Sequence, residues 1–326
     1  MKKSQQGFTL LEIFISLAIG LVLFAGVMSI FAGMKTTTSE TSSLGTLQEN
    51  GRFALSVITD DLMRQNFWGD LAVDASVSTI VPTGFPAIPA GGDCVGGGSN
   101  NASFPQAVGT FRTIWGITSV DASPMNCIND ARVGSDVLQL KRALAQAFDP
   151  LVVNPANNRF WLNTNPTNGV VFPGNIAVPL VNNAQMWQYQ HHVYYVRDEP
   201  QGNITVPVLM QGTLSNAANL MSFQPLIEGI ERIRFMYGVD TDADGFVNAY
   251  ISATNMNNAL WDNSTILAVK VYILARDILE DNNYTDTKTY LMGGLVVPAA
   301  NDNFRRLLLM STVTLHNSGE KSWLGI

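Results

Sequence analysis

The stretch Gly7-Phe8-Thr9-Leu10-Leu11-Glu12, followed by the apolar run from Ile13 to Met34, decides the fold of this 326-residue chain. The run contains no Asp, Glu, Lys or Arg. Because about 20 apolar residues cross a bilayer as a helix, the run predicts a membrane-spanning segment. Lys2 and Lys3 precede it, which predicts that the N-terminus stays in the cytoplasm and the rest of the chain lies on the far side.

Other interpretations of the apolar run stay open at this point. A secretory signal peptide would carry a small-residue cleavage site after the run, where Ala32-Gly33-Met34 stands. A plain signal anchor would have the same length and lack of charge, and so would a buried helix of a soluble protein. A secretory signal peptide would be cut after the apolar run, whereas a signal anchor or a buried helix would not be cut there.

Glu12 is the anomaly of the N-terminal segment, because it places a carboxylate among apolar residues. Such a group costs about 2.5–3.5 kcal/mol at the centre of a membrane helix, so it is a functional hypothesis by default. It needs a partner or a proton. A cut between Gly7 and Phe8 would create an amine at Phe8 that could pair with Glu12 of a neighbouring copy. Such a pair would fix the axial register of packed helices.

The stretch from Gly7 to Glu12, preceded by Lys2 and Lys3, resembles the class III leader of type IV prepilins and type II secretion pseudopilins. The resemblance implies that residues 1–7 are a leader, which a membrane prepilin peptidase removes after Gly7. It also implies that the peptidase methylates the new N-terminal Phe8, and that Glu12 sets the register in assembly. The mature chain would have 326 minus 7, or 319, residues.

The helix is expected to continue beyond the membrane segment 8–34 into an amphipathic part, 35–68, because no proline precedes Pro82. Apolar residues and one glycine recur there at steps of three and four, as on one face of a helix. They are Leu44, Leu47, Gly51, Leu55, Ile58 and Leu62. We therefore expect a helix from about Phe8 to Phe67, weakest at Thr36–Ser43, whose second half backs a globular head. Asp60 and Asp61 are expected to be solvated charges on its surface.

The region 69–170 is predicted to be variable and loop-rich, with short strands at 110–120 and 136–142, because Gly, Pro, Asn and Ser are frequent. Cys94 and Cys127 lie in this region. In an oxidising periplasm we expect them to form a disulfide. The alternative is two free thiols.

The region 171–326 is predicted to be an antiparallel sheet, because apolar and polar residues alternate with a period of two. The alternating runs are 192–196, 233–237, 269–273 and 306–315. A long helix followed by such a sheet predicts an α+β fold of the type IV pilin kind.

The same parts of the chain resemble the PilW family of minor pilins. The strings that carry the resemblance are Leu47–Ala54, Ile227–Glu231, Tyr237–Asp240, Ala268–Val271 and Thr312–Asn317. His316 departs from the family pattern, which usually has Arg there. The centre, from about residue 70 to 220, carries no quotable resemblance.

One string suggests a metal site. Asp240, Asp242 and Asp244, followed by Gly245, match positions 1, 3, 5 and 6 of a calcium loop, and Asn248 would occupy the ninth. The twelfth position should be Glu and is Ile251, so a full EF-hand is excluded. A looser calcium site and a solvated turn between two strands both stay open. Calcium is the one candidate cofactor.

Enzyme and nucleic-acid functions find little support in the sequence. The net charge is −7 and no long basic run occurs, so no direct contact with nucleic acid is predicted. Neither a Gly-x-Ser-x-Gly elbow nor a phosphate-binding Gly-Lys-Ser/Thr string is present. His191 and His192 could suggest a metal, but we expect them in a surface strand. We therefore predict that the chain is not an enzyme.

The resemblance implies a minor pilin that primes pilus assembly at or near the tip, supporting twitching motility, adhesion or DNA uptake. Its implied partners are the prepilin peptidase, other minor pilins, the major pilin, a large tip adhesin and the inner-membrane assembly platform. The implied location is the Gram-negative inner membrane, with a periplasmic head, and then the pilus. Alternatives are a J-type pseudopilin of type II secretion and a signal-anchored periplasmic binding protein.

Overall fold

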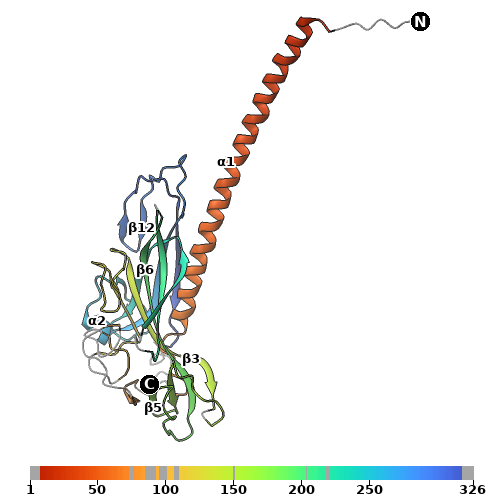
Figure 1. Cartoon of the computed structure of the whole chain (residues 1–326). Helices are drawn as coiled ribbons and strands as arrows, with labels where there is room; N and C mark the ends of the chain where they lie inside the picture. Colours follow the sequence, from red (N-terminus) through yellow and green to blue (C-terminus); the bar gives the residue numbers. More distant parts are fainter. Residues whose placement is uncertain are drawn as a thin grey trace. The chain divides into compact units, whose positions relative to one another are not determined.

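The computed structural model describes residues 8–72, 77–84, 93–94, 101–105, 110–149, 151–202, 204–217 and 221–317. They form one long helix and antiparallel β-sheets, so the predicted α+β, pilin-like fold class is confirmed (Figure 1). The chain divides into two compact units, residues 1–46 and 47–326. The second unit is the head.

The helix α1 (Leu10–Met63) runs without interruption through the Thr- and Ser-rich stretch that was expected to be its weakest part. The hydroxyl of Thr37 donates to the carbonyl of Gly33 at 3.0 Å, and that of Thr41 donates to the carbonyl of Thr37 at 2.8 Å. This bonding to the preceding turn satisfies these two hydroxyls inside the helix. A polar stretch is therefore compatible with a continuous helix here.

The helix ends at Met63, earlier than the expected end near Phe67. Asn66 adopts a left-handed backbone with φ of 58°, which an α-helix cannot continue. Its side-chain oxygen accepts a hydrogen bond from the indole nitrogen of Trp68 at 2.8 Å. Asn tolerates this conformation better than most residues, so it ends the helix before Trp68 is reached.

Within the head, the last part of α1 buries the predicted apolar face. Of the predicted residues, Leu47, Ile58 and Leu62 are each at most 2% exposed and Leu55 is partly buried. Ala54, which the predicted stripe did not include, is also fully buried. Gly51 lies so close to Leu309 that a Cβ added to it would approach a Leu309 methyl group to 2.4 Å. Most of the predicted stripe within the head is thus a packing face, and a larger residue at position 51 would require the Leu309 side chain to shift.

The larger sheet of the head contains eight strands in the order β1-β5-β4-β6-β3-β2, with β7 beside β6 and β8 beside β7. Only the β1–β5 pair is parallel among the pairs of the described strands. The strands are β1 (Ile80–Pro82, after the short 3₁₀ turn Val77–Thr79), β2 (Ile114–Thr118), β3 (Asp136–Phe148), β4 (Phe160–Thr164), β5 (Gly169–Pro173), β6 (Gln185–Gln201), β7 (Ile204–Leu214) and β8 (Met221–Glu228). The two strands expected before residue 170 are found as β2 and β3.

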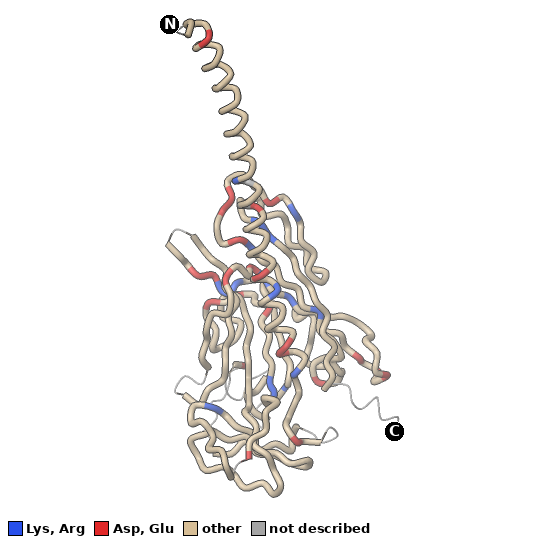
Figure 2. The backbone as a smooth tube through the Cα atoms, turned by 90° about the vertical axis from the view of Figure 1, so that its right-hand side faces the viewer, with Lys and Arg blue, Asp and Glu red and all other residues tan. Residues whose placement is uncertain are grey.

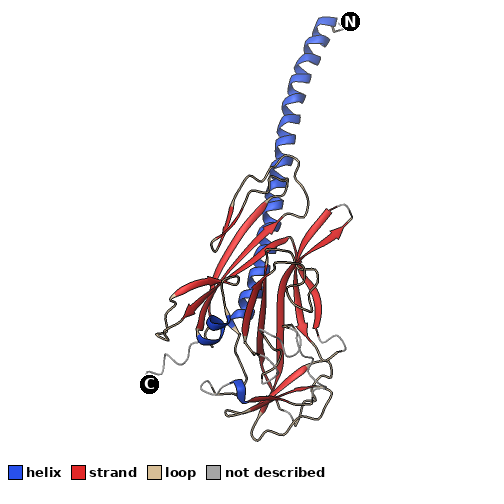
Figure 3. Ribbon diagram, turned by 90° about the vertical axis from the view of Figure 1, so that its left-hand side faces the viewer, coloured by secondary structure: helices blue, strands red, loops and turns tan. Residues whose placement is uncertain are grey.

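The second sheet contains four antiparallel strands in the order β10-β9-β11-β14. It is formed by β9 (Ile230–Asp240), β10 (Ala249–Ser252), β11 (Thr265–Arg276) and β14 (Arg306–Thr314). Figure 3 draws the strands of the head in red and the helices in blue. A short helix, α2 (Asn258–Asn263), precedes β11, and a two-stranded hairpin, β12 (Tyr290–Met292) and β13 (Leu295–Val297), precedes β14. Ile233, Phe235 and Tyr237 are fully buried, as the alternation of β9 predicts.

Gly229 lets the chain pass directly from the first sheet to the second, because it alone separates β8 from β9. Its φ is 78°, a conformation that favours glycine. Its N–H donates to the carbonyl of Pro207 at 2.7 Å, and its carbonyl accepts from the N–H of Arg276 at 2.8 Å. A Cβ at this position would lie 2.8 Å from the carbonyl oxygen of Arg276. The crossover therefore requires glycine.

We expect Gly229→Ala to lower the free energy of unfolding by about 2–4 kcal/mol, because backbone strain adds to a clash with main-chain atoms. Denaturant unfolding followed by tryptophan fluorescence measures the loss. Gly202→Ala is the control, since Gly202 has a φ of 63° and nothing within 4 Å of an added Cβ. Equal losses in the two variants would show that strain alone acts at Gly229.

Candidate functional site

The start of α1 is closed by a reciprocal pair of hydrogen bonds between Thr9 and Glu12. The N–H of Thr9 donates to Oε2 of Glu12 at 2.9 Å, and the N–H of Glu12 donates to the hydroxyl oxygen of Thr9 at 3.3 Å. This is a capping box, in which two backbone donors of the first turn are satisfied by side chains. Glu12 therefore has a partner within its own chain. The Thr-x-x-Glu spacing is the sequence signal for this box. The expectation for Glu12 considered only a proton or a partner in a neighbouring copy.

The predicted cleavage point straddles the boundary of the described residues. Gly7 and the rest of the leader 1–7 lie outside them, whereas Phe8 is described and 84% exposed. Cleavage after Gly7 and methylation of Phe8 thus stay predictions from the sequence.

The apolar run of α1 exposes its whole surface within its own unit. Every Ile, Leu, Val, Phe and Met side chain between residues 13 and 34 is 49–73% exposed. Among the described helices, α1 is the one long and apolar enough to cross a membrane. Figure 2 shows an acidic residue near the start of the helix and then a long stretch without charge. In the sequence, the first charged residue after Glu12 is Lys35. Such a surface requires lipid or other apolar helices around it.

Asp61 anchors α1 to the larger sheet of the head through a buried polar cluster. Its carboxylate accepts from Nε of Arg142 on β3 at 2.6 Å and from the hydroxyl of Tyr194 on β6 at 2.8 Å, and it contacts Nδ1 of His192 at 2.6 Å. Burial alone would raise the pKa of Asp61. The charges of His192 and Arg142, and their hydrogen bonds, outweigh burial and hold this pKa well below its ordinary value.

Two expectations about this region were wrong. Asp60 is exposed and pairs with Arg64 at 2.8 Å, as a surface charge should, but Asp61 is 4% exposed. His191 and His192 do not lie in a surface strand either, because His191 is fully buried and the side chain of His192 is 12% exposed. Neighbouring residues of a strand point to opposite faces, so the two imidazoles cannot share a metal ion.

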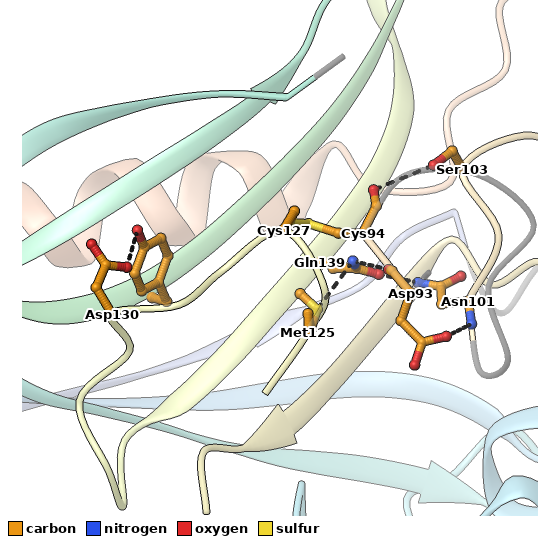
Figure 4. The surroundings of a disulfide bond; sticks show 9 residues. Asp93, Cys94, Asn101, Ser103, Met125, Cys127, Asp130 and Gln139 are labelled. Carbon is orange, nitrogen blue, oxygen red and sulfur yellow. Dashed lines mark hydrogen bonds between the residues drawn. A yellow bond between two sulfur atoms is a disulfide. The ribbon is translucent and has the colours of Figure 1, made fainter. Parts of the chain in front are cut away.

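Cys94 and Cys127 form the expected disulfide, with their Cα atoms 5.8 Å apart (Figure 4). Cys94 is fully buried. The hydroxyl of Ser103 donates to the carbonyl of Cys94 at 3.3 Å. The disulfide therefore ties two loops together against the larger sheet.

The candidate calcium loop is the turn between β9 and β10. The ligand oxygens of Asp240, Asp242 and Asp244 lie within 4.8 Å of one another. The carboxylate of Asp240 also accepts three backbone N–H groups of the turn, at 2.7–3.2 Å, and the side-chain oxygen of Asn248 accepts from the N–H of Thr241 at 2.7 Å. The turn is thus closed by its own side chains. The carboxylates fit an oxygen-ligand cation, but Ile251, in the twelfth position, offers no side-chain oxygen.

If calcium binds here, we expect a weak site with a Kd of about 10⁻⁴–10⁻³ M, since one exposed loop provides few ligands. Isothermal titration with calcium should give a signal that Asp242→Ala removes. The matched control is Glu280→Ala, an exposed acidic residue outside the loop, which should leave the signal intact. If the unaltered chain gives no signal, the calcium site is excluded and the loop is a solvated turn between two strands.

Two family models match the chain. Residues 193–317 match the type IV pilus-assembly protein W family, and residues 2–28 match the prokaryotic N-terminal methylation motif. Comparisons with curated proteins and with solved structures gave no match. The resemblance inferred from the two ends of the sequence is confirmed, and residues 29–192 lie outside both matches.

Proposed function

We propose that this chain is a prepilin of the type IV pilus-assembly protein W family and acts as a minor pilin that primes assembly of the pilus at or near its tip. The prepilin motif implies processing by a prepilin peptidase and partners in pilus assembly. The chain would enter the inner membrane through α1, lose its leader after Gly7, and then join the filament.

The observation that carries the proposal is the exposed apolar surface of α1 between residues 13 and 34, in a segment that the methylation motif overlaps. Packing such a surface among the helices of other pilins would remove it from lipid without exposing it to water. Glu12 is held at the first turn by Thr9, where it would meet the new amine of Phe8 in a neighbouring chain. That ion pair would set the axial register.

The size of the head supports a position at the tip. The head spans residues 47–326 and contains two sheets and a hairpin. So large a head could not repeat densely along a filament shaft. We propose that it forms a priming complex with other minor pilins and a large tip adhesin, above the major pilin. The match to the pilus-assembly family favours this role over that of a type II secretion pseudopilin.

Immunogold labelling of sheared filaments with an antibody to the head tests the position. We expect label at one end of the filaments, and few or no filaments in a strain that lacks the gene. Label distributed along the shaft would contradict the tip position, and normal piliation of the deletion strain would contradict the priming role.

A further inference from the structure

A second buried polar cluster lies on the face of the larger sheet opposite Asp61. Lys141 and Arg142 are consecutive residues of β3, so their side chains point to opposite faces of the sheet. Lys141 is fully buried. Its Nζ donates to Oδ1 of Asn101, and to the carbonyl of Arg112 at 3.0 Å. The amine of Lys141 and the carboxamide of Asn101 are therefore in direct contact.

Both ends of the Asn101 carboxamide have hydrogen-bond partners, and Figure 4 shows the partner on the nitrogen side, Gln139. Its Oδ1 accepts the main-chain N–H of Arg112 at 2.9 Å, and its Nδ2 donates to Oε1 of Gln139 at 2.6 Å. Asn101 is fully buried. The N–H of Arg112 points at the oxygen that would carry negative charge if a nucleophile attacked Cγ, as donors of an oxyanion hole do. Gln139 holds the nitrogen that would leave.

Burial lowers the pKa of Lys141 well below its ordinary value, and the charge of Arg112 lowers it further, which together outweigh the opposite effect of the charge of Asp93. The neutral amine is the nucleophilic form, so the environment favours the reactive state. Phe111 covers the amine, with its ring centroid 4.9 Å from Nζ. Asp93 is held beside the pair, because its Oδ1 accepts the N–H of Asn101 at 3.3 Å.

We propose that Lys141 and Asn101 form an intramolecular amide bond. The lone pair of neutral Nζ attacks Cγ of Asn101, and the N–H of Arg112 stabilises the resulting oxyanion. Nζ then loses one proton, which the carboxylate of Asp93 carries to Nδ2. The Cγ–Nδ2 bond breaks, ammonia leaves, and Nζ–Cγ becomes an amide. One amine and one carboxamide thus give one amide and one ammonia, and no oxidant or reductant is needed.

The bond would join β3 to the segment that carries the disulfide. Lys141 and Asn101 are 40 residues apart in sequence, and Cys94 lies seven positions before Asn101. The backbone carbonyl of Asp93 also accepts a hydrogen bond from Nε2 of Gln139 on β3. A covalent amide would hold this loop to the sheet even where a disulfide is reduced.

Mass spectrometry of the full chain, reduced and alkylated, tests the proposal. We expect a mass about 17 Da below that calculated for the same chain reduced and alkylated without the bond, from the loss of one ammonia. Trypsin cannot cut after an acylated Lys141, so we expect a branched peptide in which residues 65–112 are linked to residues 133–142. Fragmentation should place the link between Asn101 and Lys141.

The controls separate this bond from other losses of ammonia. Lys141→Met should restore the full mass, whereas Lys270→Met, which removes a lysine outside the cluster, should keep the loss and the branched peptide. Asp93→Asn should reduce the linked fraction at least severalfold. Trypsin cutting normally after Lys141 in the unaltered chain would overturn the proposal, even if ammonia were lost, because the loss would then reflect a succinimide.

Discussion

Asp61→Asn is expected to lower the free energy of unfolding by about 3–5 kcal/mol, because removing one partner leaves the other buried charge uncompensated. Arg142 is 5% exposed and would lose the carboxylate that lies 2.6 Å from its Nε. His192 and Tyr194 would lose the same acceptor. Denaturant unfolding of the purified chain, followed by tryptophan fluorescence, measures the change.

Asp60→Asn is the matched control for Asp61. Asp60 precedes it on the same helix, and its ion pair with Arg64 is about half exposed on both sides. We expect Asp60→Asn to lower the free energy of unfolding by about 0.5 kcal/mol or less, as is usual for exposed ion pairs one helical turn apart. Similar losses in the two variants would show that Asp61 does not anchor the helix to the sheet.

The pH dependence of stability should identify the charge of Asp61 as the cause. Its pKa is depressed in the folded chain, so its contribution is present above the unfolded-state pKa of about 4 and is lost as pH falls below it. The unaltered chain should therefore lose more stability than Asp61→Asn between about pH 4 and pH 2. Parallel pH profiles would contradict this origin.

Glu12→Ala is expected to leave processing intact and to reduce incorporation into filaments by about 10- to 100-fold, which corresponds to losing a charge-assisted bond of roughly 1.5–3 kcal/mol. The reason is that a new amine at Phe8 would lack its carboxylate among apolar helices. The measurement is the ratio of this protein to major pilin in sheared filaments, compared with the ratio in membranes.

Thr9→Val separates capping from assembly. It removes the hydroxyl that accepts from the N–H of Glu12 but keeps the carboxylate. We expect incorporation to fall by less than about fivefold, since losing one cap costs about 1 kcal/mol or less when the carboxylate still caps the helix. An equal defect in both variants would mean that Glu12 acts through the helix cap and not through an intermolecular pair.

The regular elements could be predicted because their signals are local. The steps of three and four from Leu47 to Leu62 describe the buried face of α1, and the alternation in β9 describes the buried face of its sheet. The disulfide could be predicted because the N-terminal segment implies a head in the periplasm, which is oxidising. The early end of α1 could not be placed in this way, because it depends on the conformation of a single residue, Asn66.

The buried polar clusters could not be predicted, because their partners are far apart in sequence. Asp61 lies 81 residues before Arg142 and 131 before His192. A helix pattern alone gives no reason to bury an Asp beside its exposed neighbour. The contact between Lys141 and Asn101 likewise appears only when β3 meets the disulfide-bonded loop. The capping box was different, since Thr9 and Glu12 carry it in the sequence itself.

The N-terminal sequence and intact mass of the protein recovered from sheared surface filaments test the central claim most directly. The account predicts a chain that begins at N-methylated Phe8 and includes the head. A chain that still begins at Met1 and is found only in membranes would contradict it, and would point to a signal-anchored periplasmic protein.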